Sequence, residues 1–146
     1  IQFKNSKTIE FGFRFNSSAE DLNYALPLNY LYEPNAALMK VGSFNRLAEA
    51  FQLKKLHPNS HLFTSTELIT DFPGRAFKIN QISDYKPRYL KKELKKSKMN
   101  VSTRNFPIVA KDLIHLFKIK EGGNQYAFFT TDINHQKIYI SCTKEY

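Results

Sequence analysis

The segment from Lys86 to Pro107 constrains the fold most, because it carries most of the excess positive charge of the chain. Eight of its residues are Lys or Arg and one is acidic, so its local charge is 8 − 1 = +7, against +9 for all 146 residues. Such a cluster of cations stays in contact with water or with an anion. The segment is therefore expected at the surface of whatever core the nearly charge-balanced remainder builds.

The first part of this segment is typical of a helix. Pro87 suits a first helical turn, and Leu90 and Leu94 lie one turn apart on one face. At about 100° per residue, the cations fall on one arc of roughly 160° beside a thin apolar stripe. An outward basic helix face is predicted, although a solvated lysine-rich helix without a ligand remains an open alternative. The predicted arc consists of Arg88, Lys91, Lys92, Lys95, Lys96 and Lys98.

Composition narrows the class of partner. With 42% hydrophobic and 14% aromatic residues, the chain can bury the core of one domain or of two small ones. A net charge of +9 and a pI near 9.6 favour a polyanion, which is RNA, DNA or an anionic membrane surface. A membrane is the weaker candidate, because no apolar run approaches a spanning length. The single cysteine, Cys142, excludes an internal disulfide and fits a reducing cytoplasm.

Periodicity predicts an α+β fold with largely antiparallel sheets and helices on one face. Leu22 to Tyr32, interrupted by Pro27, is expected to be irregular or edge-like. The predicted strands are Thr8 to Phe15, Ala76 to Ile82, Met99 to Arg104, and the hairpin of 125–131 with 137–143. The predicted helices run from Ala36 to about Phe51, capped by Asn35 and broken near Gly42, from Pro87 onwards, and from Pro107 to Phe117.

Candidate catalytic and metal-binding residues are few. His57 and His61 have the spacing of a helical metal pair, but Pro58 between them indicates a loop, so structural histidines are favoured. Glu33 is either a catalytic carboxylate or, as we favour, a residue that fixes a loop or helix end. Cys142 is interpreted as a buried thiol. No catalytic or metal-binding residue is assigned.

The glycines and the end of the basic segment give two further expectations. The five glycines nowhere form the strand, glycine loop and helix of a dinucleotide or adenosylmethionine site, so no cofactor-binding residue is assigned. Gly122-Gly123 is interpreted as a turn that needs positive φ. Beyond the arc, Arg104 and Phe106 could meet RNA backbone and an unstacked base, although a core position is favoured for Phe106. Arg104 therefore joins the six residues of the arc as predicted nucleic-acid-binding residues.

Five phrases occur in order along the chain, and they are YLYEPNAALMK, LHPNSHLFTS, DFPGRAF, NVSTRNFP and KIKEGGNQYAFFTT. Together they resemble the C-terminal half of bacterial class I SAM-dependent methyltransferase-like proteins, in which a small ferredoxin-like module precedes a THUMP-like domain. The resemblance covers the chain from about Tyr30 and implies a ferredoxin-like module over residues 1–84 and a THUMP-like domain over residues 85–146.

The resemblance implies a function. A Rossmann-like catalytic domain that holds S-adenosyl-L-methionine would lie upstream of Ile1, and this chain would be its noncatalytic, RNA-binding C-terminal region. THUMP domains are associated with RNA modification, so tRNA or rRNA and the chain's own methyltransferase domain are the expected partners, in the cytoplasm and without a membrane. The alternative is a protein-interaction module that packs on the catalytic domain or another partner, with lysines that serve solubility.

Overall fold

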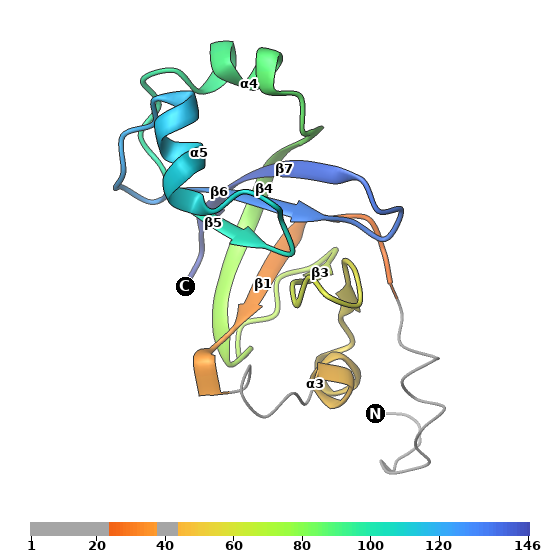
Figure 1. Ribbon diagram of the computed structural model, residues 1–146. Helices are drawn as coiled ribbons and strands as arrows, with labels where there is room; N and C mark the ends of the chain where they lie inside the picture. The colour runs from red at the N-terminus through yellow and green to blue at the C-terminus, as the bar shows by residue number, and fades with distance from the viewer. Residues whose placement is uncertain (1–23, 38–43) are drawn as a thin grey trace.

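The computed structural model describes residues 24–37 and 44–146, and the strands in these ranges form one sheet (Figure 1). The sheet has seven strands in the order β2-β3-β1-β4-β7-β6-β5. All neighbouring strands are antiparallel except β5 and β6, which confirms the predicted α+β class with largely antiparallel pairing. The strands are β1 (Tyr30–Pro34), β2 (Lys54–Lys55), β3 (Phe63–Ser65), β4 (Gly74–Asp84), β5 (Asn100–Arg104), β6 (Gln125–Thr131) and β7 (Lys137–Lys144). The helices are α3 (Phe44–Phe51), α4 (Pro87–Leu94) and α5 (Ala110–Phe117).

The position of β1 corrects the prediction for residues 22–32. These residues were expected to be irregular or edge-like, but β1 begins at Tyr30 and lies inside the sheet, between β3 and β4. Pro27 precedes the strand and Pro34 ends it, so neither proline interrupts the ladder of hydrogen bonds between them. Sequence reasoning gave too much weight to Pro27.

The longest strand, β4, lies in the middle of the sheet and connects its two halves, β2-β3-β1 and β7-β6-β5. Its residues 74–78 pair with β1, and its residues 77–84 pair with β7. The register of the second pairing shifts between Ile79 and Gln81, which marks a bulge. A bulge bends its strand and increases the local twist, so the sheet curves along β4.

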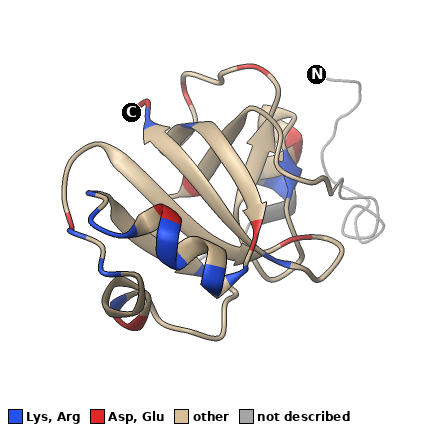
Figure 2. Ribbon diagram, turned by 90° about the horizontal axis from the view of Figure 1, so that it is seen from above, with Lys and Arg blue, Asp and Glu red and all other residues tan. Residues whose placement is uncertain are grey.

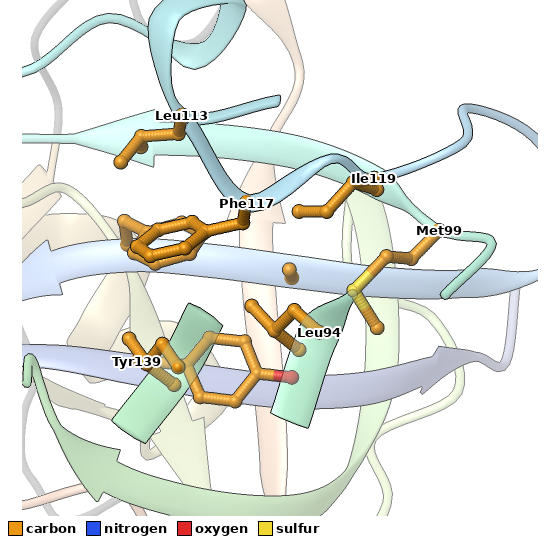
Figure 3. Packing of buried hydrophobic residues seen from close by; sticks show 9 residues of the cluster. Leu94, Met99, Leu113, Phe117, Ile119 and Tyr139 are labelled. Atoms are coloured by element: carbon orange, nitrogen blue, oxygen red, sulfur yellow. The ribbon is translucent and has the colours of Figure 1, made fainter. Parts of the chain in front are cut away.

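The described helices pack on one face of this sheet. Successive side chains of a strand point to opposite faces, and directly opposed residues of neighbouring strands share a face. Ala48 of α3 packs with Tyr32 and Ala76 at one end of this face. At the other end, α4 and α5 close over the strands, as Figure 3 shows for Leu94, Met99, Leu113, Phe117, Ile119 and Tyr139. The predicted placement of helices on one face agrees with this packing.

The opposite face is covered by the loop between β2 and β3. Leu56 and Leu62 of that loop are fully buried against Leu31, Phe77 and Phe128 of three different strands. Hydrogen bonds from Leu56 N to the Leu62 carbonyl (3.0 Å) and from Ser60 N to the His57 carbonyl (3.1 Å) keep the loop compact. Cys142 is buried in this core as predicted, and burial raises the pKa of its thiol.

The C-terminal hairpin matches its prediction closely. β6 ends at Thr131 and β7 begins at Lys137, and the turn is closed by a hydrogen bond from Asp132 N to the Gln136 carbonyl (3.0 Å). The carboxylate of Asp132 also accepts hydrogen bonds from the backbone N–H groups of Asn134 (2.9 Å) and Gln136 (3.0 Å). The predicted strand Thr8 to Phe15, and the break near Gly42, lie outside the described residues.

Gly74 gives the first testable prediction. An added Cβ would lie 2.2 Å from the carbonyl oxygen of Glu33 and 2.9 Å from the Cα of Pro34, both backbone atoms of β1. We expect Gly74→Ala to lower the free energy of unfolding by about 1–3 kcal/mol, because the paired strand must shift. Urea denaturation measures the change, with the exposed substitution Lys78→Ala on the same strand as control. Equal stability of the two variants would contradict the close approach of β1 and β4.

Candidate nucleic-acid interface

The helix α4 presents its charge outward. Leu90 and Leu94 are buried in the core beneath it, whereas Arg88, Lys91 and Lys92 are exposed. This arrangement follows from the spacing of the two leucines, which leaves the remaining faces of the helix to water. Figure 2 shows blue segments along α4 and along the chain that follows it.

The helix is shorter than the predicted basic arc requires. It ends at Leu94, so Lys95, Lys96 and Lys98 do not continue its face. Lys96 has a φ of 67°, the left-handed conformation that ends helices. The prediction of a single helical arc from Arg88 to Lys98 was therefore wrong in its extent, because the Lys pattern has no signal for where the helix stops.

The lysines that follow α4 are held near other cations by pairing with the chain that follows α5. The chain after α4 runs beside the chain after α5, with hydrogen bonds from Lys96 N to the Lys118 carbonyl (3.1 Å) and from Lys120 N to the Ser97 carbonyl (2.8 Å). A parallel bridge also pairs Lys98 with Lys120. The pairing adds Lys118 and Lys120, which were not among the predicted nucleic-acid-binding residues because they lie 22 residues beyond their partners Lys96 and Lys98 along the chain.

We call this collection of exposed cations the basic surface. Its acidic neighbours in the chain are Glu93 and Glu121, giving a sum of 9 − 2 = +7. None of these cations forms an ion pair with an acid of the described residues. The basic surface consists of Lys86, Arg88, Lys91, Lys92, Lys95, Lys96, Lys98, Lys118 and Lys120.

A diglycine supports Lys98 in this surface. Gly122 and Gly123 have φ values of 128° and 81°, which agrees with their interpretation as a turn that needs positive φ. A Cβ on Gly122 would come within 3.0 Å of the Cε of Lys98, so the lysine side chain lies against the bare backbone of the turn. The turn is further held by a hydrogen bond from Asn100 Nδ2 to the Gly123 carbonyl (2.9 Å).

Two residues of the predicted nucleic-acid surface have other positions. Arg104 lies at the end of β5, where its guanidinium forms an ion pair with Glu33, so it does not join the basic surface. Phe106 packs edge-on against Tyr85, with ring centroids 5.0 Å apart, and against Phe129 at 5.7 Å. These contacts agree with the favoured core position of Phe106.

Glu33 is the centre of a separate ion-pair cluster. Its carboxylate accepts hydrogen bonds from Arg75, whose Nε donates at 2.8 Å, and from the guanidinium of Arg104. The side chain of Glu33 is only 6% exposed, against 36% for Arg75 and 32% for Arg104. The Arg75 guanidinium also lies over the rings of Phe77 (5.3 Å) and Tyr126 (5.2 Å). These contacts favour the expected structural role for Glu33 over a catalytic one, but Glu33 links strands of the sheet and does not fix a loop or a helix end as predicted.

The contact between Glu33 and Arg104 shows that the sheet is strongly curved. β1 and β5 are four positions apart in the strand order, which in a flat sheet is about 19 Å, farther than the two side chains reach. Their contact requires the sheet to curl until its last strand returns towards β1. The ion pair therefore closes the curved sheet around the β2–β3 loop.

A second polar cluster joins the same parts of the chain. The Nδ1 atom of His57 accepts a hydrogen bond from Asn59 N (3.0 Å) and lies 3.3 Å from Asn105 Nδ2. Nδ1 is therefore unprotonated, so His57 Nε2 carries the proton and donates to His135 Nδ1 at 3.2 Å. Ser60 adds a hydrogen bond to the carbonyl of Thr131 (2.7 Å).

Burial disfavours the charged forms of His57 and Lys55 in this cluster. It lowers the pKa of His57, which His135 and Lys55 lower further and Asp132 partly raises. Burial also lowers the pKa of Lys55 to about 8, and Lys55 Nζ donates to the Pro58 carbonyl at 2.8 Å. No group of three His, Cys, Asp or Glu residues in the described ranges is arranged to hold a metal ion.

The described residues do not fit a site for S-adenosyl-L-methionine of the glycine-loop type. Such a site needs a glycine turn between a strand and the N-terminus of a helix. Gly74 opens a strand, and Gly122 and Gly123 lie between a helix and a strand. The described glycines therefore form no glycine-loop cradle for the cofactor, and no step of a methyl transfer is assigned to this part of the chain.

Comparisons with known proteins identify the class of each half of the chain. Residues 30–73 match the model of a ferredoxin-like domain family, and residues 74–144 match the model of a family described as THUMP domain-like. The chain thus comprises a ferredoxin-like domain followed by a THUMP-like domain. The two matches meet at the start of β4, whereas the boundary expected from the sequence, at residues 84 and 85, stays a prediction.

One solved structure is similar over the whole chain. It is the crystal structure of a putative methyltransferase from Porphyromonas gingivalis W83, with 32% sequence identity and a TM-score of 0.81. The similarity covers 100% of this chain and 37% of that protein, so the chain spans well under half of its relative. A comparison with curated proteins found no match. None of the described helices has the length and apolarity needed to cross a membrane.

Removal of the Glu33 charge gives the second prediction. Glu33→Gln leaves two arginines without their shared anion, and we expect it to lower the free energy of unfolding by about 2 kcal/mol. The expected loss is below that of a fully buried pair, because each arginine remains about one-third exposed to water. Chemical denaturation measures it, and the exposed Glu67→Gln is the control. Equal effects of the two substitutions would show that the sheet closes without the ion pair.

The histidine cluster gives the third prediction, on pH. Since the pKa of folded His57 lies below its ordinary value of 6.5, the unfolded chain takes up the proton first as the pH falls. Neutral His57 therefore contributes to stability above pH 6.5. Below that pH the free energy of unfolding falls, by no more than about 1.4 kcal/mol per pH unit for this residue. His57→Gln should therefore flatten the fall in stability between pH 7.5 and 5.5, leaving the part from His61, whose pKa is also lowered. An unchanged slope in thermal denaturation would exclude this role.

Proposed function

We propose that this chain is the RNA-binding, noncatalytic C-terminal region of a SAM-dependent methyltransferase that acts on structured RNA such as tRNA or rRNA. The proposal is supported by the THUMP-like match over residues 74–144 and by the similarity to a putative methyltransferase from Porphyromonas gingivalis W83. The methyl donor would be bound by a domain outside this chain. That domain would supply the methyl group, and this chain would hold the RNA.

The observation that carries the proposal is the unpaired basic surface. Like charges held this close repel one another, and a polyanion relieves that repulsion while it releases its own counterions. The basic surface lies wholly within residues 74–144, the THUMP-like part. The ion-paired Arg104 shows that this chain neutralises a cation where the fold requires it.

The chemistry of the surface suits phosphates better than base edges. Of its cations all but Arg88 are lysines, which are flexible point charges without the planar fork that reads guanine. Phosphate contacts fix the register and orientation of a nucleic acid without reading its sequence. The basic surface would therefore recognise the shape and charge of A-form RNA and orient the target nucleotide towards the catalytic domain.

The fourth prediction tests this surface by charge reversal. The triple substitution Lys92→Glu, Lys95→Glu and Lys96→Glu should abolish RNA binding in a filter-binding assay and leave the thermal midpoint nearly unchanged, because exposed substitutions usually cost less than about 0.5 kcal/mol each. For the unsubstituted chain, log K should fall with log salt concentration at a slope of roughly −2 to −5, as expected for about three to five neutralised phosphates.

A matched control separates this surface from net charge. The exposed residues Arg46, Lys54 and Lys78 lie outside the basic surface, and their reversal to Glu changes the net charge by the same amount. Equal loss of binding in both triple variants, or tight binding without a salt slope, would reject the mechanism. RNA binding that survives both reversals would favour the alternative, a protein-interaction module whose lysines serve solubility.

A further inference from the structure

Tyr89 differs from the other described aromatic residues in its exposure to solvent. It is 44% exposed, and of the Phe and Tyr side chains whose burial the structure describes, it alone is exposed. The others are buried or half-buried, many of them in the clusters around the sheet. The first turn of α4 carries this ring, so the exposed aromatic lies within the basic surface.

The position of Tyr89 on α4 defines what it borders. At about 100° per residue, its side chain leaves the helix between the arc of Arg88 and Lys92 and the line of Glu93. Tyr89 is 44% exposed, so its ring is open to solvent beside these cations.

We propose that Tyr89 stacks on an unpaired base of the bound RNA, so that the preferred ligand combines a duplex with an adjacent single-stranded nucleotide. This inference rests on the proposed function, and it specifies the class of RNA. A base inside an A-form duplex is stacked on both faces and cannot reach a protein ring, whereas an unpaired base can. Phosphates bound by Arg88 and Lys92 would bring the next nucleotide over the ring.

The structure distinguishes this position from the other aromatic candidate. Phe106 follows the basic segment in sequence, but its ring is occupied by Tyr85 and Phe129. Tyr89 makes no hydrogen bond or ring contact with another described residue, so the fold itself does not explain its aromatic side chain. The exposed apolar residue Val109, at the start of α5, offers no π face and serves as a control.

The experiment compares two RNA hairpins with the same number of phosphates. One is blunt and fully paired, and the other replaces its last base pairs by a single-stranded tail. Fluorescence anisotropy with the full 146-residue chain should show tighter binding of the tailed hairpin. Tyr89→Ala should weaken the tailed complex by about 5- to 100-fold and the blunt complex by less than about twofold, as expected for loss of one stacked base.

Two further variants separate stacking from apolar contact and from folding. Tyr89→Phe keeps the ring and should retain the preference for the tail, whereas Tyr89→Leu keeps the apolar bulk and should lose it. Val109→Ala should bind both hairpins as the unsubstituted chain does. A 2-aminopurine placed in the tail should lose fluorescence on binding to the unsubstituted chain and keep it with Tyr89→Ala, which reports stacking directly.

Each outcome bears on a different claim. If neither hairpin binds, both the proposed function and this inference are wrong. If both hairpins bind equally well, or if Tyr89→Leu retains the preference, RNA binding stands and the stacking role is rejected. The role is also rejected if Tyr89→Ala weakens both complexes equally, because the ring would then support the basic surface as a whole.

Discussion

The fold depends on one buried carboxylate that two arginines share. Glu33 belongs to β1, in the ferredoxin-like part, whereas Arg75 and Arg104 belong to β4 and β5 in the THUMP-like part. The interaction thus links the ferredoxin-like and THUMP-like parts and closes the curved sheet between them. Hydrogen bonds from the β2–β3 loop to His135 and Thr131 cross the same boundary, and the leucines of that loop fill the space between. The two domains consequently share one sheet and one of its cores.

The ion pair between β1 and β5 also helps to position the basic surface. At one end of β5, Arg104 is paired with Glu33 of β1. The other end begins two residues after Lys98, which pairs with Lys120. A strand is nearly inextensible, so the seven residues from Lys98 to Arg104 connect the ion pair to the lysines over about 20 Å. The basic surface is therefore positioned by a rigid element whose far end is fixed in the ferredoxin-like part.

Local periodicity predicted the elements whose stability is local, and long-range contacts decided the rest. The hairpin of β6 and β7, the strand β5 and the helix α5 followed from alternation and from helical spacing. Of the four apolar residues expected on the core side of α5, Leu113 and Phe117 are buried, whereas Val109 and Leu116 are exposed. The central position of β1 did not follow from local patterns, because it depends on partners at residues 63–65 and 74–78. The end of α4 at Leu94 and the recruitment of Lys118 and Lys120 depend on hydrogen bonds between two helix ends. The ion pair of Arg104 and the exposure of Tyr89 likewise depend on which residues fold onto them.

Helix electrostatics explains only part of the basic surface. Cations near a helix C-terminus are stabilised by the helix dipole by about 0.3–1 kcal/mol each, which suits Lys91 and Lys92 in the last turn of α4. The same dipole disfavours cations at the N-terminus, yet Lys86 is the N-cap residue, Arg88 follows in the first turn, and that turn contains no acid. A helix selected for its own stability would carry Asp or Glu there. The cations at the start of α4 therefore oppose the local preference of the helix, which favours a role in binding an anion over one in stabilising the fold.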